Sequence, residues 1–208
     1  MWDTWRPVGS DGQDVWGLIS DIHGNLPALE LALQLLDDAG ARKLAFLGDY
    51  LGRGDSEGCV QRIRGVADIA IVGNRDLDWQ DRVSSATRAY VLTLPRIEQA
   101  GRLLVSHGDS RLTPALSTSQ IARGFVRVWP EMEQRHAQIW AFGHSHHARV
   151  WRNGAQVSEC DRVPIDDDAL YCLNVGTTGL PFPGKSEPSV AVVDFVHGQI
   201  RQLTLERI

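Results

Sequence analysis

The sequence predicts an α/β fold in which parallel strands alternate with helices, and three observations support this prediction. Short apolar runs recur at 15–20, 43–47 and 68–72, and polar residues or glycine bound each of them. Segments with helical spacing of apolar residues separate these runs, so the order β-α-β-α-β implies parallel strands joined by right-handed crossovers. From Tyr171 onward the chain is β-rich, and a second sheet contributed by these C-terminal strands would give a layered α/β sandwich.

The first repeat is a strand at 15–20, followed by a helix and by a second strand at 43–47. Asn25 is a suitable N-cap for this helix, and Pro27 suits its first turn. Gly40 is a suitable C-terminal stop. The inner face of the helix is apolar because leucines recur at helical spacing, at Leu26, Leu29, Leu33 and Leu36.

The remaining elements follow from the same criteria. Asn153-Gly154 is a strong tight-turn signal, so we expect a hairpin at 150–157, and His197-Gly198 marks another turn. Further helices are expected at 56–64, 84–92 and 119–129. Further strands are expected at 102–106, 138–142, 171–175, 189–196 and 199–205.

The length and composition bound the organisation of the chain. A chain of 208 residues that is 43% hydrophobic can bury one sizeable core, and no internal repeat or long linker divides it. We therefore expect a single domain, 1–208, in which residues 1–14 form a loosely held N-terminal extension.

Charge and cysteine content exclude several classes of protein. The net charge is −5 and the positive residues are dispersed, so no dedicated nucleic-acid-binding surface is evident. No apolar run reaches the roughly 18 residues that a membrane span needs, and the start of the chain has no signal-peptide core. Cys59, Cys160 and Cys172 lie far apart without CxxC spacing, which argues against a disulfide framework or a structural zinc site. We expect a cytoplasmic protein that does not bind membranes, and the oligomeric state stays open.

Side chains that can bind metals follow several predicted strands at the point where each strand ends. In parallel sheets, ligands bind at the carboxyl ends of strands. Hard oxygen ligands and imidazoles gathered at such an edge can hold two divalent cations that share one carboxylate and one water. The motifs are Asp21-Ile22-His23, Gly48-Asp49, Gly73-Asn74-Arg75-Asp76, His107-Gly108 and Gly143-His144-Ser145-His146.

Two of these motifs pair ligands that are two residues apart. In an extended segment, the side chains of Asp21 and His23 project from the same side and can grip one ion, and His144 and His146 share this spacing. His147 should then point to the opposite side, so we leave it out of the metal set.

Together, the motifs resemble those of the calcineurin-like metallophosphoesterases, whose pattern runs Asp-x-His, Gly-Asp, Gly-Asn-His-Asp or -Glu, His, and Gly-His-x-His. The match spans 21–146 in the family's order, and 174–181 resembles the segment that closes the site in small bacterial members. The resemblance implies a four-layer α/β/β/α sandwich and two divalent metal ions, with Mn, Fe, Zn, Ni and Co as the candidates. It also implies that Asp21, His23 and His146 hold the first metal, that Asn74, His107 and His144 hold the second, and that Asp49 bridges them.

Phosphoester hydrolysis is the reaction that this resemblance implies. Two ions about 3.5 to 4 Å apart lower the pKa of a bridging water and generate the attacking hydroxide at neutral pH. The expected partner is a small-molecule phosphoester or a nucleotide, and the expected activity is that of a phosphodiesterase or a broad-specificity phosphatase. The expected catalytic set is Asp49, Asn74, Arg75 and Asp76.

Arg75 departs from the family's pattern, because it stands where the family usually has the histidine that assists the leaving group. Arginine, with a pKa above about 12, cannot readily release a proton, so the chain should favour leaving groups that need little protonation, such as phenolates or phosphates. Asp76 would normally orient the histidine and here could form a salt bridge with Arg75. Two alternatives stay open: Arg75 is a solvated surface charge, or the chain is a catalytically weak or inactive interaction module that keeps the fold.

Arg53 matches the position at which protein-phosphatase-like members place a phosphate-binding arginine. Those members have aspartate where this chain has Gly52, which argues against a protein substrate. We take Arg53 and Arg75 as candidates for binding substrate phosphate, because a guanidinium can bind a phosphate through two parallel hydrogen bonds. The alternative for Arg53 is an ordinary surface arginine.

Overall fold

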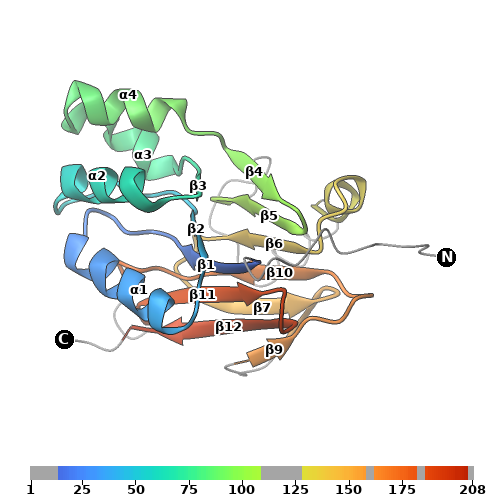
Figure 1. Cartoon of the computed structure of the whole chain (residues 1–208). Helices are drawn as coiled ribbons and strands as arrows, with labels where there is room; N and C mark the ends of the chain where they lie inside the picture. The colour runs from blue at the N-terminus through green and yellow to red at the C-terminus, as the bar shows by residue number, and fades with distance from the viewer. Residues whose placement is uncertain (1–13, 109–127, 158–161, 182–185, 206–208) are drawn as a thin grey trace.

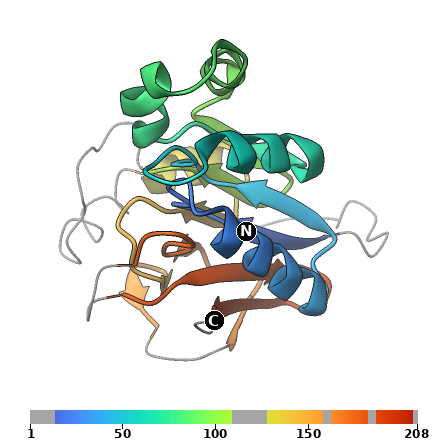
Figure 2. The same ribbon diagram turned by 90° about the vertical axis from the view of Figure 1, so that its left-hand side faces the viewer.

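A computed structural model of the chain describes residues 14–108, 128–157, 162–181 and 186–205. Two six-stranded β-sheets pack face to face, and helices α1 to α4 gather on the outer side of the first sheet (Figure 1). Figure 2, viewed from the helix side, shows α1 and α2 in front of the strands. Within the described ranges, no helix is long and apolar enough to cross a membrane.

The first sheet has the strand order β3-β2-β1-β11-β12-β9. β1 lies at the boundary between a parallel half and an antiparallel half, because it pairs with β2 in parallel and with β11 in antiparallel orientation. The parallel half comprises β1 (Val15–Ile19), β2 (Lys43–Phe46) and β3 (Ile69–Ala70). The antiparallel half comprises β11 (Ser189–Asp194), β12 (Gln199–Thr204) and β9 (Arg162–Pro164).

The second sheet has the strand order β4-β5-β6-β10-β7-β8. Its centre is parallel and comprises β5 (Leu103–Ser106), β6 (Ile139–Phe142) and β10 (Tyr171–Asn174). Antiparallel strands flank this centre, namely β4 (Ile97–Ala100) on one side and β7 (Arg149–Arg152) with β8 (Ala155–Gln156) on the other. β7 and β8 form the predicted hairpin, and Asn153 and Gly154 take φ values of 48° and 83° at its turn.

Side chains alternate between two faces along the strands, and this alternation builds the layers. In β1, Trp16 and Leu18 face the core between the two sheets, whereas Val15 and Ile19 pack against the helices. On the outer face of the second sheet, Trp140 and Phe142 pack with Met132, which lies in the helical segment 128–134. The layers therefore run helix, sheet, sheet, helix, which confirms the predicted four-layer α/β/β/α sandwich.

The assignment of strands to sheets differs from the prediction. The prediction that the C-terminal strands make a second sheet is wrong. β11 and β12 extend the first sheet, and β10 joins the second. β5 and β6, which continue the strand rhythm of the first half, belong to the second sheet instead. The spacing of apolar residues and the local composition identify a strand. Which strand it pairs with depends on contacts between segments far apart in the chain.

The predicted helices form with boundaries close to those expected. Helix α1 (Leu26–Asp38) has Asn25 as its N-cap, whose side chain accepts a hydrogen bond from the N–H of Ala28 at 3.1 Å. Four apolar residues of α1 lie against the first sheet, at Leu29, Ala32, Leu33 and Leu36. Helix α2 (Ser56–Val66) begins after the N-cap Asp55, and α4 (Ser85–Thr93) begins after the N-cap Ser84.

Several elements of the structure were not predicted, and some predicted elements lie outside the described residues. Helix α3 (Asn74–Trp79), the 3-10 turn η1 (Gln80–Arg82), β4 and β9 were missed, and β3 is shorter than the expected strand at 68–72. Most of the predicted helix at 119–129 lies outside the described residues. The structure describes a helical segment at 128–134 in this region. The expected extension at 1–14 also lies outside them, apart from Asp14.

Candidate metal centre

The predicted metal ligands converge where the carboxyl ends of strands from both sheets meet. Asp21 follows β1, Asp49 follows β2, and Asn74 begins α3 just beyond β3, all on the first sheet. His107 follows β5, and the segment with His144 and His146 follows β6, both on the second sheet. Segments up to 125 residues apart in sequence thus contribute to one site.

The backbone at this site is left-handed, which differs from the extended conformation expected for the paired ligands. Among the described residues, seven non-glycine residues have positive φ, and five of these seven are predicted ligands. This conformation is unfavourable for residues with a Cβ and persists only where the surrounding structure imposes it, often at functional sites. The five ligands are Asp21 (φ 55°), His23 (φ 52°), Asp49 (φ 58°), His144 (φ 67°) and His146 (φ 61°).

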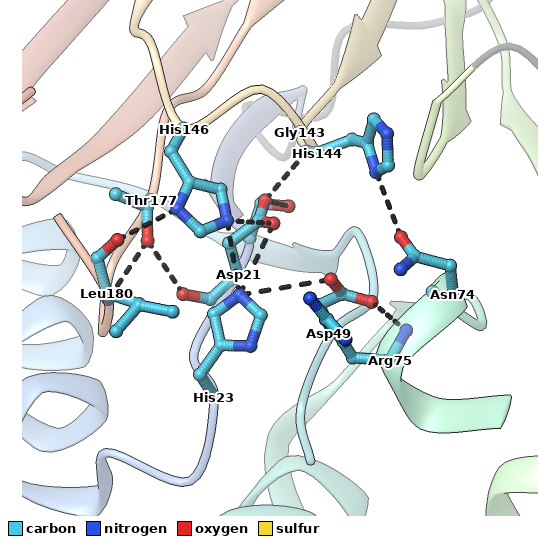
Figure 3. Close-up of polar contacts among 12 residues, drawn as sticks. Asp21, His23, Asp49, Asn74, Arg75, Gly143, His144, His146, Thr177 and Leu180 are labelled. Atoms are coloured by element: carbon cyan, nitrogen blue, oxygen red, sulfur yellow. Dashed lines mark hydrogen bonds and ion pairs between the residues drawn. The ribbon is translucent and has the colours of Figure 1, made fainter. Parts of the chain in front are cut away.

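Three residues form a first donor group (Figure 3). Nε2 of His146 lies 3.1 Å from Oδ1 of Asp21 and 3.2 Å from Nε2 of His23. Nε2 of His23 lies 3.7 Å from the same Asp21 oxygen. One carboxylate oxygen and two imidazole nitrogens therefore point at a common centre.

A second donor group comes from Asn74, His107 and His144. Oδ1 of Asn74 lies 3.1 Å from Nε2 of His107 and 2.9 Å from Nδ1 of His144, and the two ring nitrogens are 3.3 Å apart. His144 and His146, two residues apart, therefore serve different groups rather than gripping one ion together. This division agrees with the assignment that the family resemblance implies.

Asp49 lies between the two donor groups. Its Oδ2 is 3.8 Å from Nε2 of His23 in the first group and 3.3 Å from Nε2 of His107 in the second. Asp49 is almost fully buried. Its position is the one expected of a carboxylate shared by two cations.

A segment that the sequence only marked as closing the site, 174–181, holds the first donor group in place. The Thr177 hydroxyl donates to the Asp21 carbonyl at 2.9 Å, and the N–H of Leu180 donates to that hydroxyl at 3.0 Å (Figure 3). The carbonyl of Leu180 is 2.8 Å from Nδ1 of His146. Asn174 steadies the histidine loop by donating to the Gly143 carbonyl and to Ser145 Oγ.

Backbone carbonyls determine which nitrogens of two histidines face the site. A carbonyl can only accept, so Nδ1 of His146 carries a proton toward Leu180, and Nδ1 of His107 carries one toward the Leu47 carbonyl at 2.7 Å. Nε2 of each ring is therefore left to face the carboxylates. A lone pair on Nε2 can bind a cation there, and in its absence a proton would occupy the same position.

The pKa values of the metal-free site follow from this arrangement. Burial lowers the pKa of His107, but the carboxylates of Asp49 and Asp21 outweigh burial and raise this pKa to about 10. Burial raises the pKa of Asp21, but the charge of His107 and the nearby imidazoles of His146 and His23 hold that pKa well below its usual range. Burial and the neighbouring His107 lower the pKa of His144. The site therefore concentrates negative charge that positive charge must balance.

The donor set fits divalent cations, and one buried atom supports this fit directly. Asp21 is fully buried, and its Oδ2 accepts hydrogen bonds from Ser20 Oγ at 2.6 Å and from the N–H of His144 at 2.9 Å. Oδ1 of Asp21, in contrast, faces the imidazole nitrogens of the first donor group, with Nε2 of His146 at 3.1 Å and Nε2 of His23 at 3.7 Å, and within the described part of the chain no backbone N–H or hydroxyl donates to it. A buried carboxylate oxygen needs a partner, and here that partner is either a proton on a facing imidazole or a coordinated cation.

Asp76 has a different role from the one predicted, because it forms no salt bridge with Arg75. Its buried carboxylate accepts four backbone hydrogen bonds, from the N–H groups of Asp49, Tyr50, Leu51 and Gly73, at 2.7 to 3.0 Å. Burial and the charge of Asp49 raise the pKa of Asp76 to about 6. Asp76 thus ties the loop after β2 to the loop after β3.

Arg75 and Arg53 both lie at the surface. The guanidinium of Arg75 is 3.7 Å from Oδ2 of Asp78, and about half of its side chain is exposed, at 53%. The backbone N–H of Arg75, in contrast, donates to Oδ1 of Asp49 at 2.7 Å (Figure 3). Arg53 is exposed and lines a pocket beside the start of α2.

Sequence reasoning missed several residues that position the ligands. The carbonyls of Leu47 and Leu180 are main-chain groups, so no residue type signals their role. Ser20, adjacent to Asp21, gave no signal of its own, and Thr177 lay in the segment noted by resemblance without an assigned role. His147, which was set aside as a ligand, lies with Nδ1 2.6 Å from the Ser145 carbonyl.

Comparison with known proteins identifies the family and the fold of the chain. Residues 15–198 match the model of the calcineurin-like phosphoesterase superfamily domain. An uncharacterised protein of Methanocaldococcus jannaschii is 26% identical over 205 residues, covering 85% of this chain and 81% of that protein. A crystal structure of a metallophosphoesterase from Sphaerobacter thermophilus superposes with a TM-score of 0.77 at 23% identity, covering 93% of this chain and 89% of that one. An archaeal phosphodiesterase superposes with a TM-score of 0.58 at 16% identity, covering 92% and 99% of the two chains.

Proposed function

Because the chain belongs to the calcineurin-like phosphoesterase superfamily, we propose that it is a phosphoester hydrolase that uses two divalent cations. The observation that carries this proposal is the position of Asp49, whose Oδ2 lies between His23 of one donor group and His107 of the other. A shared carboxylate is the feature that distinguishes a two-metal site from two separate sites.

Two cations held by these groups would lower the pKa of a shared water and bind the non-bridging oxygens of a phosphate ester. The chain's own residues prepare the site for that chemistry. Asp21, Asp49 and Asn74 offer oxygens, and the carbonyls of Leu180 and Leu47 turn Nε2 of His146 and His107 inward. Candidate metals are Mn, Fe, Zn, Ni and Co, which bind mixed oxygen and imidazole ligands.

The leaving group receives no proton from residue 75. A guanidinium is a poor proton donor, and that of Arg75 lies 3.7 Å from Oδ2 of Asp78 at the surface. The substrate class that best fits is therefore a small phosphoester or nucleotide whose leaving group is already a weak base. Phosphodiesters of phenols and phosphoanhydrides meet this condition, and alkyl monoesters do not.

The test is hydrolysis by protein reconstituted with manganese, with metal content measured on the same samples. We expect two manganese ions per chain and turnover of bis-p-nitrophenyl phosphate, with p-nitrophenyl phosphate and nucleotides as further substrates. Asp49→Asn should abolish activity because it removes the shared negative charge. Full metal content without turnover of any of these substrates would contradict the proposal and favour an interaction module.

A further inference from the structure

A pocket of about 420 Å3 lies between the start of α2 and the end of α3. One wall is the segment 52–57, which leads into α2, and the other wall comprises Trp79, Arg82 and Val83. None of these residues is a predicted metal ligand.

Both walls of the pocket extend from loops that carry predicted metal ligands. Gly52 follows Asp49 by three residues and packs against the backbone of His23 so closely that a Cβ at position 52 would overlap the His23 carbonyl. On the other wall, Trp79 lies in the same short helix as Asn74, five residues later. At about 1.5 Å rise per residue, these two residues are about 8 Å apart along the helix axis. Both walls of the pocket are therefore fixed to the loops that carry predicted metal ligands.

Two arginines of the pocket are available to a ligand. The Arg82 guanidinium lies over the Trp79 ring at 4.3 Å from its centroid, and Arg53 is exposed. Within the described part of the chain, neither guanidinium has a carboxylate oxygen within 4.0 Å. The nearby Asp81 does not compete for Arg82, because it pairs with Arg88 at 2.8 Å.

The two carboxylates of the pocket are engaged by other donors. Asp55 caps α2 by accepting the N–H of Gly58 at 2.8 Å. Glu57 accepts the N–H of Ser84 at 2.5 Å and the Ser84 hydroxyl at 3.1 Å, and it also accepts the Thr87 hydroxyl. These bonds join the start of α2 to the segment after η1, so Glu57 holds the two walls together and the pocket is preformed.

We propose that this pocket binds the leaving group of the substrate and that this leaving group is a nucleoside monophosphate. Arg53 and Arg82 hold its phosphate, and the stacked surface of Arg82 and Trp79 lies beside its organic part. This inference rests on the proposed function and specifies its substrate class as a phosphoanhydride.

The reaction balances without an acid at position 75. Water adds its oxygen to the scissile phosphorus, and the bond from that phosphorus to the bridging oxygen breaks. The bonding pair stays on the bridging oxygen, which becomes a terminal phosphate oxygen of the departing nucleotide. One of the water's two protons passes to solvent, and the other stays on the oxygen added to the scissile phosphorus. A phosphate leaves as an anion, whereas an alkoxide would need a proton, so the pocket and Arg75 favour the same substrates.

Calorimetric titration of the full-length chain with AMP and with adenosine tests this proposal. The chain is titrated once loaded with manganese and once after chelator treatment. We expect AMP to bind in both states and more tightly than adenosine, because the pocket recognises phosphate without the metals. Arg82→Ala should weaken AMP binding by about tenfold through the loss of charged hydrogen bonds.

Arg64→Ala is the matched control, since the Arg64 guanidinium also lies over an aromatic ring, that of Tyr90, but outside the pocket. Its affinity for AMP should equal that of the wild type. AMP binding only with manganese present, adenosine binding as tight as AMP, or no effect of Arg82→Ala would each overturn the proposal. Hydrolysis of bis-p-nitrophenyl phosphate by the wild type tests the proposed function separately, because that substrate carries no second phosphate.

Discussion

The backbone N–H of Arg75 donates a 2.7 Å hydrogen bond to Oδ1 of Asp49, the carboxylate that lies between the two donor groups. The residue that departs from the family pattern therefore supports the centre through its main chain. Its side chain turns to Asp78 instead. Any residue other than proline would preserve the main-chain bond, so the site can tolerate a change of side chain at position 75.

Arg75→His should restore a group that can release a proton to a leaving alkoxide. We expect unchanged manganese content and about 10- to 100-fold faster hydrolysis of alkyl phosphate esters, with little change for p-nitrophenyl esters. The measurement is kcat/KM for paired esters that differ only in the leaving group. Equal effects on both esters, or none on either, would show that residue 75 does not control leaving-group protonation.

Asp76→Asn should destabilise the fold by about 2–4 kcal/mol, because one carboxylate oxygen becomes an NH2 that faces two N–H donors. Urea denaturation of the metal-free protein measures this loss. Asp78→Asn is the control, since Asp78 is exposed and lies 3.7 Å from the Arg75 guanidinium in a surface ion pair, and it should change stability by less than about 0.5 kcal/mol. Similar stability of the two variants would refute the role assigned to Asp76.

Gly143→Ala should damage the metal centre, because a Cβ at position 143 would overlap Ser20 Oγ and the Asp21 carboxylate. We expect metal affinity to fall about 10- to 100-fold, as when groups that orient metal ligands are displaced. Gly65→Ala in α2 is the matched control, because its Cβ would meet nothing within 4 Å and the change favours a helix by roughly 0.5–1 kcal/mol. Competition with a fluorescent chelator reports both affinities, and equal values would contradict the packing argument.

Metal affinity should rise with pH. The metal-free site holds a proton on His107 up to its pKa of about 10, and the pKa of His146 is also raised because Asp21 outweighs burial. A cation that binds Nε2 must displace such a proton, so each displaced proton should strengthen binding about tenfold per pH unit below that pKa. Calorimetry in two buffers of different ionisation enthalpy counts the released protons. A metal affinity that stays constant between about pH 7 and pH 9 would argue against protonated ligands in the metal-free site.

Local signals in the sequence predicted the elements that carry the site, but not how they pair. Helix α1 was predicted from the cap Asn25 and four leucines, and the β7–β8 hairpin was predicted from Asn153-Gly154, because caps and tight turns depend on adjacent residues. The place of β11 beside β1 was not predictable, since it depends on packing between residues more than 170 positions apart. Helix α3 was missed because six residues give too short a pattern to show helical spacing.

The candidate site was predictable to a similar extent. All seven ligand candidates were proposed from residue type and position, and the structure brings their side chains together. Their left-handed backbone was not predicted, because aspartate and histidine adopt it only where the surrounding structure requires it. The sequence suggested a salt bridge for Asp76, whereas its carboxylate accepts four backbone N–H groups. This difference was not predictable, because it depends on how two loops fold, which residue types do not reveal.

Anomalous diffraction from crystals grown with manganese would locate the bound cations themselves. We expect two peaks about 3.5–4 Å apart. One should lie among Asp21, His23 and His146 and the other among Asn74, His107 and His144, with the Asp49 carboxylate contacting both. A single peak, or two peaks without Asp49 between them, would contradict the shared two-metal centre.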